Sequence, residues 1–518
     1  MNKYESGNPI NNRTQSSPPA PLLKERGASP PLAGVAEGRG WTLLRYCLLL
    51  PLLWAAGCSD DNNGTDPTPE PAEDAAEIIY TFASNAPATN AYTVTLNGKP
   101  CYVFPAQTAD IVTFGIDNSK GDVEVAITSK AAVANVKIRP TSAGITPAVN
   151  GNTITFTLTG PQYLSVEIND TYTGRPLLLF ADAPETDIPA SNVIRYEAGK
   201  IHDIGGDFAL TGEKAVYIAP GAIVYGGLKV TNRENIRITG RGILSGGRFI
   251  DRDYRMMELE KLSRLRIEGI TIVDSKSWTV ALSACNDIDI QDVKIVNRAP
   301  TDDGIDIVGS QNVRIDHCFI HTADDCVAIK AGDEWYLEYA QDDVVNVSVK
   351  NSVFWIPNPD SNVFEIGYET GADTIKNILY ENNDIIHLVG AAASTRGAFS
   401  IHNCGRAVVD NIKYKDIRVE DASVYLMDFR VMYDPTYSKK DTNRGKIGDV
   451  YLENISVTTT PGGTVSSIMR SYSATANIEH VWIKNMTVNG QKITRQADLN
   501  LNAGQPGVAL NMPEITIE

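Results

Sequence analysis

From about residue 184 to the C-terminus, the sequence repeats a short strand pattern without an intervening amphipathic helix. Each repeat places an Ile- or Val-rich segment after an Asn or Asp and a turn, as in residues 235–238, 287–290, 312–315, 346–349 and 409–412. Most successive segments lie about 23 to 35 residues apart. Repeats of this length without helices indicate a solenoid, because each coil buries its apolar side chains against the next coil. We therefore expect an all-β chain in which residues 184–518 form a parallel β-helix.

Residues 78–183 follow a different pattern, with short runs of alternating apolar and polar residues. The pairs Asn97-Gly98 and Asn150-Gly151 are typical of two-residue hairpin turns. About a hundred residues of this kind predict a small β-sandwich in front of the β-helix. No cluster of reactive side chains stands out in this segment. We expect a packing or spacer domain, with glycan binding as the alternative.

The first 57 residues contain the one membrane-directed stretch that the sequence suggests. A Leu-rich run at 48–53 follows Arg39 and Arg45 and is too short to span a bilayer. It ends in Ala-Ala-Gly-Cys, which resembles a bacterial lipobox with Cys58 as the lipidated residue. We expect residues 1–57 to be an N-terminal extension with a lipoprotein signal peptide; an ordinary signal peptide is the alternative. Residues 58–77 are acidic and contain Pro, which predicts a flexible linker. The expected location is the cell envelope, by a lipid anchor, at the outer membrane.

Charge and cysteine content exclude several classes of protein. The formal net charge of -17 argues against nucleic-acid binding, which needs a basic face. Apart from Cys47 and Cys58 there are five cysteines without a C-x-x-C pair, so neither a disulfide framework nor a zinc site is predicted. We expect these to be buried free thiols: Cys101, Cys285, Cys318, Cys326 and Cys404. No cofactor and no metal are expected.

Two acidic clusters carry the chemical signal. The first holds Asp302, Asp303 and Asp306, and the second holds Asp324 and Asp325. Asp303 and Asp324 are 21 residues apart, about one coil of a solenoid of short strands. Parallel strands lie about 4.8 Å apart, so the two clusters would be neighbours. Turn chemistry is the ordinary explanation for Asp, but stacked like charges are destabilising unless a proton, water or ligand relieves them. Paired carboxylates suit the hydrolysis of glycosidic bonds, with either a retaining or an inverting spacing.

Both clusters resemble the acidic motifs of the polygalacturonase family, glycoside hydrolase family 28. The matching segments are Thr-Asp-Asp-Gly-Ile-Asp at 301–306 and Ala-Asp-Asp-Cys-Val-Ala-Ile-Lys at 323–330. The segment before the β-helix is similar to the β-sandwich of the dextranase and isopullulanase relatives, family 49. This resemblance implies a right-handed, pectin-lyase-like β-helix and an inverting hydrolase. Asp324 would be the general acid, while Asp303 and Asp325 would hold and activate the attacking water. Since Asp324 and Asp325 cannot both face one side of a regular strand, the chain must bend there.

The substrate is a polysaccharide or oligosaccharide. Residues near the acids are candidates for contacting it: Asp302, Asp306, Trp278, Glu365, Tyr368, Glu369 and His402. Two departures argue against polygalacturonate: the family's Gly-His-Gly reads Ser361-Asn362-Val363 here, and its Arg-Ile-Lys falls at about 398–402, which lacks both cations. A neutral glucan or another polysaccharide therefore gains weight. A calcium-dependent polysaccharide lyase and a non-catalytic glycan-binding surface protein are the alternatives.

Overall fold

The computed structural model describes most of the chain after residue 74. The described residues are 75–169, 175–248, 255–332, 342–357, 361–388, 397–423, 425–438, 442–501 and 512–518. The predicted signal peptide, Cys58 and nearly all of the predicted linker lie outside these ranges. Among the described residues, no helix has the length and apolar character needed to cross a membrane. Pro71–Glu518 is a single compact unit by its contacts.

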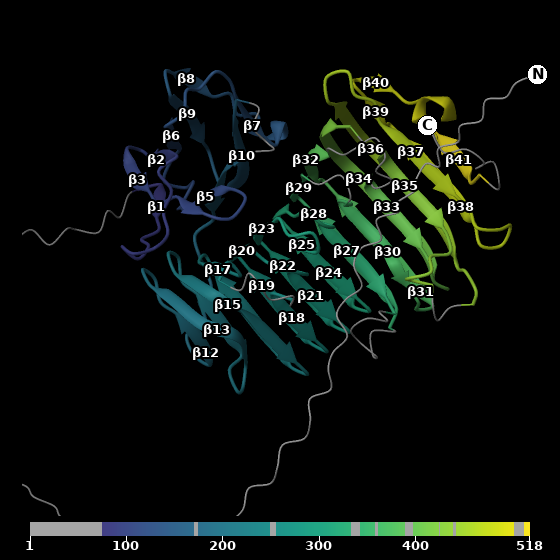
Figure 1. Ribbon diagram of the computed structural model, residues 1–518, viewed down its shortest axis with the longest axis horizontal. Coiled ribbons are helices and arrows are strands. Elements are labelled where there is room, and N and C mark those ends of the chain that lie inside the picture. The colour runs from purple at the N-terminus through teal and green to yellow at the C-terminus, as the bar shows by residue number, and fades with distance from the viewer. Residues whose placement is uncertain are drawn as a thin grey trace, which may run out of the picture. The chain divides into compact units, whose positions relative to one another are not determined.

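The N-terminal part of the described chain consists of two small sheets (Figure 1). One sheet holds β1 (Glu77–Ile79), β4 (Phe104–Pro105), β5 (Asp110–Ile116), β7 (Val136–Arg139), β10 (Gln162–Ile168) and β11 (Leu177–Asp182). The other holds β2 (Tyr92–Leu96), β3 (Lys99–Cys101), β6 (Val123–Ser129), β8 (Ala148–Asn150) and β9 (Thr153–Leu158). Alternate residues of β6 and β9 are buried, as expected for strands with one face on a core. A short 3₁₀ helix, Thr141–Ala143, follows β7.

Asn97-Gly98 forms the turn between β2 and β3, as predicted, with positive φ at both residues. The second predicted turn is displaced by one residue. Asn150 pairs with Thr153, so Gly151 and Asn152 make the turn between β8 and β9. Because Asn150 and Thr153 are the last paired residues of β8 and β9, the two-residue loop must consist of the two residues between them.

The rest of the chain forms a 30-stranded sheet wound into a parallel β-helix, whose strands run side by side from teal to yellow in Figure 1. Its strands are β12 (Val193–Tyr196), β13 (Ile201–Ala209), β14 (Ala215–Ile218), β15 (Ile223–Thr231), β16 (Glu234–Gly240), β17 (Ile243–Ser245), β18 (Met257–Glu260), β19 (Ser263–Glu268), β20 (Thr271–Val273), β21 (Val280–Ser283), β22 (Asn286–Gln291), β23 (Lys294–Val296), β24 (Ile305–Val308), β25 (Gln311–Asp316), β26 (Phe319–His321), β27 (Val327–Ala331), β28 (Val344–Lys350), β29 (Val353–Ile356), β30 (Phe364–Thr370), β31 (Thr374–Glu381), β32 (Asp384–Leu388), β33 (Gly397–Asn403), β34 (Val408–Ala422), β35 (Tyr425–Val431), β36 (Lys446–Thr459), β37 (Ser466–Arg470), β38 (Ile478–Lys484), β39 (Thr487–Val488), β40 (Gln491–Lys492) and β41 (Glu514–Ile517). A 3₁₀ helix, Gln496–Leu499, lies near the end. This architecture confirms the predicted fold class.

Stacked apolar side chains form the core of the β-helix. In one inward column Ile288 pairs with Val313, which pairs with Val347, and all three are at most 2% exposed. Each such side chain contributes about 1.5–3 kcal/mol by its burial. The column recurs in every coil, which explains the repeated Ile and Val of the sequence.

Asn residues near the start of successive strands form a ladder. Asn312, Asn346, Asn377 and Asn411 each donate a side-chain hydrogen bond of 2.8 to 3.0 Å to the Asn one coil earlier. All four have positive φ, a conformation that Asn adopts more readily than most residues. The Asn that marks each repeat is therefore required at the corner of the coil.

Side chains of the N-terminal sheets pack on one face of the β-helix. Tyr163 and Phe180 share an apolar cluster with Phe319 and Trp355. Lys294, fully buried in the β-helix, donates to Asp182 at 2.7 Å. All five predicted free thiols are free, and four of them are buried.

Candidate active site

The two predicted acidic clusters converge. Asp303 precedes β24, and Asp324 and Asp325 precede β27. These strands are hydrogen-bonded neighbours, with Ile305 opposite Val327. Each of the three carboxylates offers one oxygen, and these oxygens lie within 4.8 Å of one another. Asp324 is partly exposed, whereas Asp303 and Asp325 are 3% and 6% exposed. The acids thus meet at the surface with two of them largely covered.

The chain bends at Ala323 and Asp324, as expected. The Asp325 amide donates to Asp303 Oδ1 at 3.1 Å, and the Gly304 amide donates to the Asp325 carbonyl at 2.8 Å. A Cβ on Gly304 would lie 2.4 Å from the Cys326 carbonyl oxygen. Only glycine lets the two turns approach so closely.

Asp302 lies inside the molecule and ties the turns together. Its Oδ1 accepts from the amides of Ala323 (2.8 Å) and Asp324 (3.0 Å), and its Oδ2 accepts from the Ala299 amide (2.6 Å). Burial raises the pKa of Asp302 to about 8. The three amide hydrogen bonds act in the opposite direction, because they favour the charged carboxylate. Asp302 is 0% exposed and therefore supports the two acidic turns from within the protein.

Lys330 links the first cluster to the β27 strand. Its ammonium group donates to Asp303 Oδ2 at 2.7 Å and to Asp306 Oδ1 at 2.5 Å. Asp306 is fully buried, and burial raises its pKa well above the ordinary value, although Lys330 acts in the opposite direction. The Lys330 ammonium also lies 3.6 Å from the centroid of the Trp278 ring, and the Arg255 guanidinium lies 4.3 Å from the same centroid. Two cations thus contact the Trp278 ring.

A second buried network lies on the following strands. Glu365 accepts from His402 Nδ1 at 2.8 Å, and His402 Nε2 lies 3.3 Å from Asp428 Oδ2. Burial alone would lower the pKa of His402, but Glu365 and Asp428 raise it to about 9. Asp428 also accepts two hydrogen bonds from Arg430, each of 2.6 Å. His402 and its two acids are fully buried, so they link three successive strands.

The predicted substrate contacts therefore fall into two groups. Asp302, Asp306, Glu365 and His402 are fully buried, with side-chain polar atoms engaged inside the protein. Trp278 and Tyr368 are partly exposed, and Glu369 is 8% exposed. The Tyr368 ring stacks on His402 at 4.4 Å. The geometry brings only the second group close to the surface.

Lys330 is a functional candidate to which the sequence analysis gave no role. The signal was present, because Lys330 and Asp306 are polar residues inside apolar strands one coil apart. Their pairing is diagonal, since the register sets Asp306 against Ala328 and Lys330 against Val308. That offset could not be read from the spacing.

The three acids could also serve as oxygen ligands for a divalent cation. Lys330 already supplies a positive charge to Asp303 at 2.7 Å. A cation here would compete with the ammonium group for the Asp303 carboxylate.

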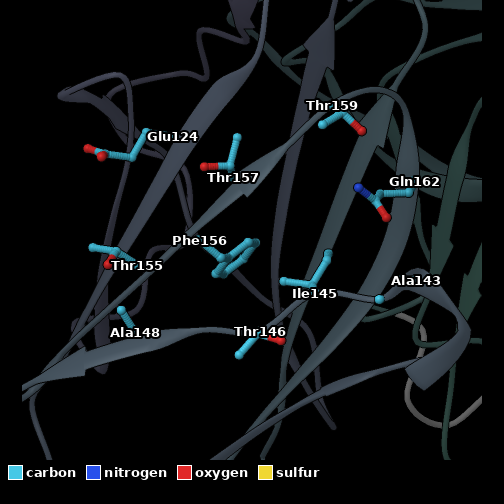
Figure 2. Close-up of a pocket in the computed structure, with 11 residues that line it drawn as sticks. Glu124, Ala143, Ile145, Thr146, Ala148, Thr155, Phe156, Thr157, Thr159 and Gln162 are labelled. Carbon is cyan, nitrogen blue, oxygen red and sulfur yellow. The ribbon is translucent and has the colours of Figure 1, made fainter.

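A separate hollow of about 520 Å³ lies on the N-terminal sheets. Figure 2 shows Thr155, Thr157, Gln162 and Glu124 among its lining side chains. Of the lining residues, all of which the structure describes, Glu124 alone has an ionisable side chain. The hollow lacks the paired acids of the other site, so Asp303, Asp324 and Asp325 remain the candidate catalytic group.

Comparisons with known proteins agree with this geometry. Residues 251–503 match the sequence profile of glycosyl hydrolases family 28. The chain is 36% identical over 115 residues to a probable polygalacturonase of Vitis vinifera, covering 20% of this chain and 23% of that one. It is 25% identical over 248 residues to exopolygalacturonase B of Aspergillus niger, covering 43% and 53%. The chain thus spans less than a quarter of the plant relative and about half of the fungal one.

Among solved structures, Dex49A from Penicillium minioluteum has a TM-score of 0.56 at 17% identity, covering 85% of this chain and 96% of that one. The matched part of this chain is longer than the β-helix alone, so the match includes the N-terminal sheets. It confirms the expected fold of N-terminal sheets followed by a β-helix. The paired acidic turns lie within the span that matches the family profile. Over residues 251–503 of its parallel β-helix, the protein is therefore similar to glycosyl hydrolases family 28.

Proposed function

We propose that this protein hydrolyses glycosidic bonds in a polysaccharide with inversion at the anomeric carbon. The observation that carries the proposal is the convergence of Asp303, Asp324 and Asp325 within 4.8 Å. One water can bridge oxygens at this separation, because two hydrogen bonds of about 2.8 Å span it. Carboxyl groups about 5 Å apart are the usual spacing of retaining enzymes and wider pairs that of inverting ones, so the inversion proposed here rests on the resemblance to family 28 and not on the spacing.

The surroundings of each acid suggest its role. Asp303 contacts the Lys330 ammonium, and Asp325 accepts from two groups of Asn362, so both are stabilised as carboxylates. Asp324 is the most exposed of the three and is assigned as the acid. In the reaction Asp324 gives its proton to the leaving oxygen as the glycosidic bond breaks. The water oxygen bonds to the anomeric carbon, and its proton passes to Asp303 or Asp325.

The substrate is a pectic or neutral polysaccharide. The polygalacturonase relatives favour a galacturonan. Against a galacturonan, two cations on the strands of this region are engaged by acids of the protein: Lys330 by Asp303 and Asp306, and Arg430 by Asp428. Among the residues that the structure describes, Lys330 and Arg430 are thus already paired with acids of the protein, which favours neutral or sparsely charged stretches of chain as the substrate.

Two measurements test the proposed reaction. Purified protein is screened on polygalacturonate, rhamnogalacturonan, dextran and pullulan for new reducing ends, and the first-formed anomer is identified by NMR. Release of an inverted anomer supports the proposal, and a retained anomer overturns inversion. A product absorbing in the near ultraviolet, lost in chelator, would instead identify a lyase. Binding without any cleavage would identify a glycan-binding protein.

We also propose that Cys58 is lipidated and anchors the protein to the cell envelope, at the outer membrane. The support is the Ala-Ala-Gly-Cys sequence at 55–58. Incorporation of labelled palmitate into the wild type but not into Cys58→Ala is expected, and label retained in the variant would exclude this anchor.

A further inference from the structure

We propose that Lys330 is a positioning residue for the general base, holding Asp303 charged and in a single orientation. This inference rests on the proposed hydrolysis and deepens it by adding a residue to the site. Lys330 lies at the outward position of β27, one coil after the turn that carries Asp303.

The contacts leave Asp303 little freedom. Its Oδ2 accepts from the Lys330 ammonium at 2.7 Å, and its Oδ1 accepts from the Asp325 amide at 3.1 Å. Both oxygens are therefore anchored by groups on the next coil. Lys330 is held in turn by Asp306 at 2.5 Å and by the Trp278 ring at 3.6 Å. A carboxylate anchored at both oxygens presents a fixed lone pair to a water.

The charges around this group are mostly acidic. Lys330 interacts with Asp303, Asp306 and Glu369, and the buried Asp302 lies beside Asp303. One oxygen each of Asp324 and Asp325 lies within 4.8 Å of an oxygen of Asp303, and the Arg255 guanidinium lies 4.3 Å from the centroid of the Trp278 ring. Crowded acids favour proton uptake. Lys330 is the cation in direct contact with Asp303, so it offsets that tendency at the atom that must accept a proton.

Burial distinguishes this role from substrate binding. Lys330 is 5% exposed and its ammonium is already engaged by two carboxylates and a ring. Burial alone would lower the pKa of Lys330, but Asp303, Asp306 and Glu369 raise it well above its ordinary value. It therefore stays charged through the working range of a hydrolase and neither donates nor accepts the reacting proton.

Lys294 supplies a matched control. It is another fully buried lysine of the β-helix, paired with Asp182 at 2.7 Å on the face that packs against the N-terminal sheets. Lys294→Met should lower the melting temperature and leave the pH profile of kcat/KM unchanged. Any effect on the profile that is specific to Lys330 then reflects the site and not the loss of a buried charge.

The experiment compares Lys330→Met, Lys330→Arg and Asp306→Asn in the full chain. Lys330→Met should lower kcat at least 100-fold with KM changed less than threefold, and should move the acidic limb of kcat/KM up by one pH unit or more. Lys330→Arg should keep the acidic limb of kcat/KM at the pH of the wild type. Asp306→Asn should leave this limb at the same pH or move it to lower pH. A Lys330→Met variant that only melts earlier, with the limb unmoved, would overturn the inference.

A second readout does not need activity. In protein labelled with ¹³C at the Asp carboxyl groups, the Asp303 resonance is identified by its loss in Asp303→Asn. Its protonation midpoint should rise in Lys330→Met and stay in Lys294→Met; an unmoved midpoint in Lys330→Met overturns the inference. If the wild type cleaves none of the polysaccharides, the proposed hydrolysis fails, and this titration still decides the role of Lys330.

Discussion

Asp325 Oδ1 accepts two hydrogen bonds from Asn362, one from its backbone amide at 2.7 Å and one from its side-chain amide at 3.0 Å. The Asn362 side-chain oxygen in turn accepts from the Gly397 amide and the Ser400 hydroxyl on the following coil. Asn362 therefore joins three coils behind one catalytic acid. It stands where the polygalacturonase motif resembled by this region has its histidine.

Asn362→Ala should reduce kcat about 10- to 100-fold, because Asp325 loses a donor that fixes its orientation. It should also cost about 1–3 kcal/mol of unfolding free energy, since buried partners are left unsatisfied. Asn383→Ala is the control, because Asn383 is equally buried and also bonds two backbone groups, away from the acids. Equal losses of kcat in both variants would contradict a specific role for Asn362.

Gly304→Ala should reduce kcat by at least tenfold while the chain still folds. The added methyl group would meet the Cys326 carbonyl oxygen at 2.4 Å and must push the Asp303 turn away from the Asp325 turn. Gly212→Ala is the control, because a Cβ there meets nothing within 4 Å. Initial rates and melting temperatures of both variants check this, and a fully active Gly304→Ala would show that the turn tolerates displacement.

Arg139 should be the most costly single charge to remove from the contact between the N-terminal sheets and the β-helix. It is 1% exposed and pairs with Glu167 at 3.1 Å and with Glu420 and Asp421. Arg139→Met leaves buried acids uncompensated, which costs about 3–5 kcal/mol. Lys137→Met should change stability by less than about 0.5 kcal/mol, since Lys137 is half exposed and 3.9 Å from Asp421. Chemical denaturation measures both, and similar values would contradict the account.

Stability should fall as the pH rises from about 6.5 to 9. The pKa of His402 is about 9 in the folded chain, where Glu365 and Asp428 outweigh burial, and about 6.5 when unfolded. Protonated His402 thus adds stability that is complete below pH 6.5 and is lost as the pH passes 9, up to about 3 kcal/mol. Glu365→Gln removes one partner and should flatten this dependence, measured by denaturation at several pH values. An equal slope in both proteins would contradict the pairing.

Much of this site was predictable because it depends on local repeats. The spacing of Asp303 and Asp324 by one coil placed their turns side by side, and the bend at Asp324 followed from the alternation of a strand. The Asn ladder likewise explains the pattern from which the fold was predicted.

What escaped prediction depends on register and on partners in other coils. His402 was expected at the substrate, but Asp428 and Glu365 on neighbouring strands enclose it. Lys330 reaches Asp306 across a diagonal offset of two residues, which spacing does not reveal. The burial of His402 and Lys330 depends on how successive coils stack. The sequence of a single segment does not show which side chains of other coils will cover it.

The most direct test of the central claim is the rate of reducing-end release by Asp324→Asn on the polysaccharide that the wild type cleaves best. The variant keeps the shape of the side chain and removes the proton donor, so activity should fall by at least about 100-fold. Its melting temperature should stay the same or rise, because one of three crowded charges is gone. Wild-type rates in Asp324→Asn would contradict the assignment of the acidic turns as the catalytic site.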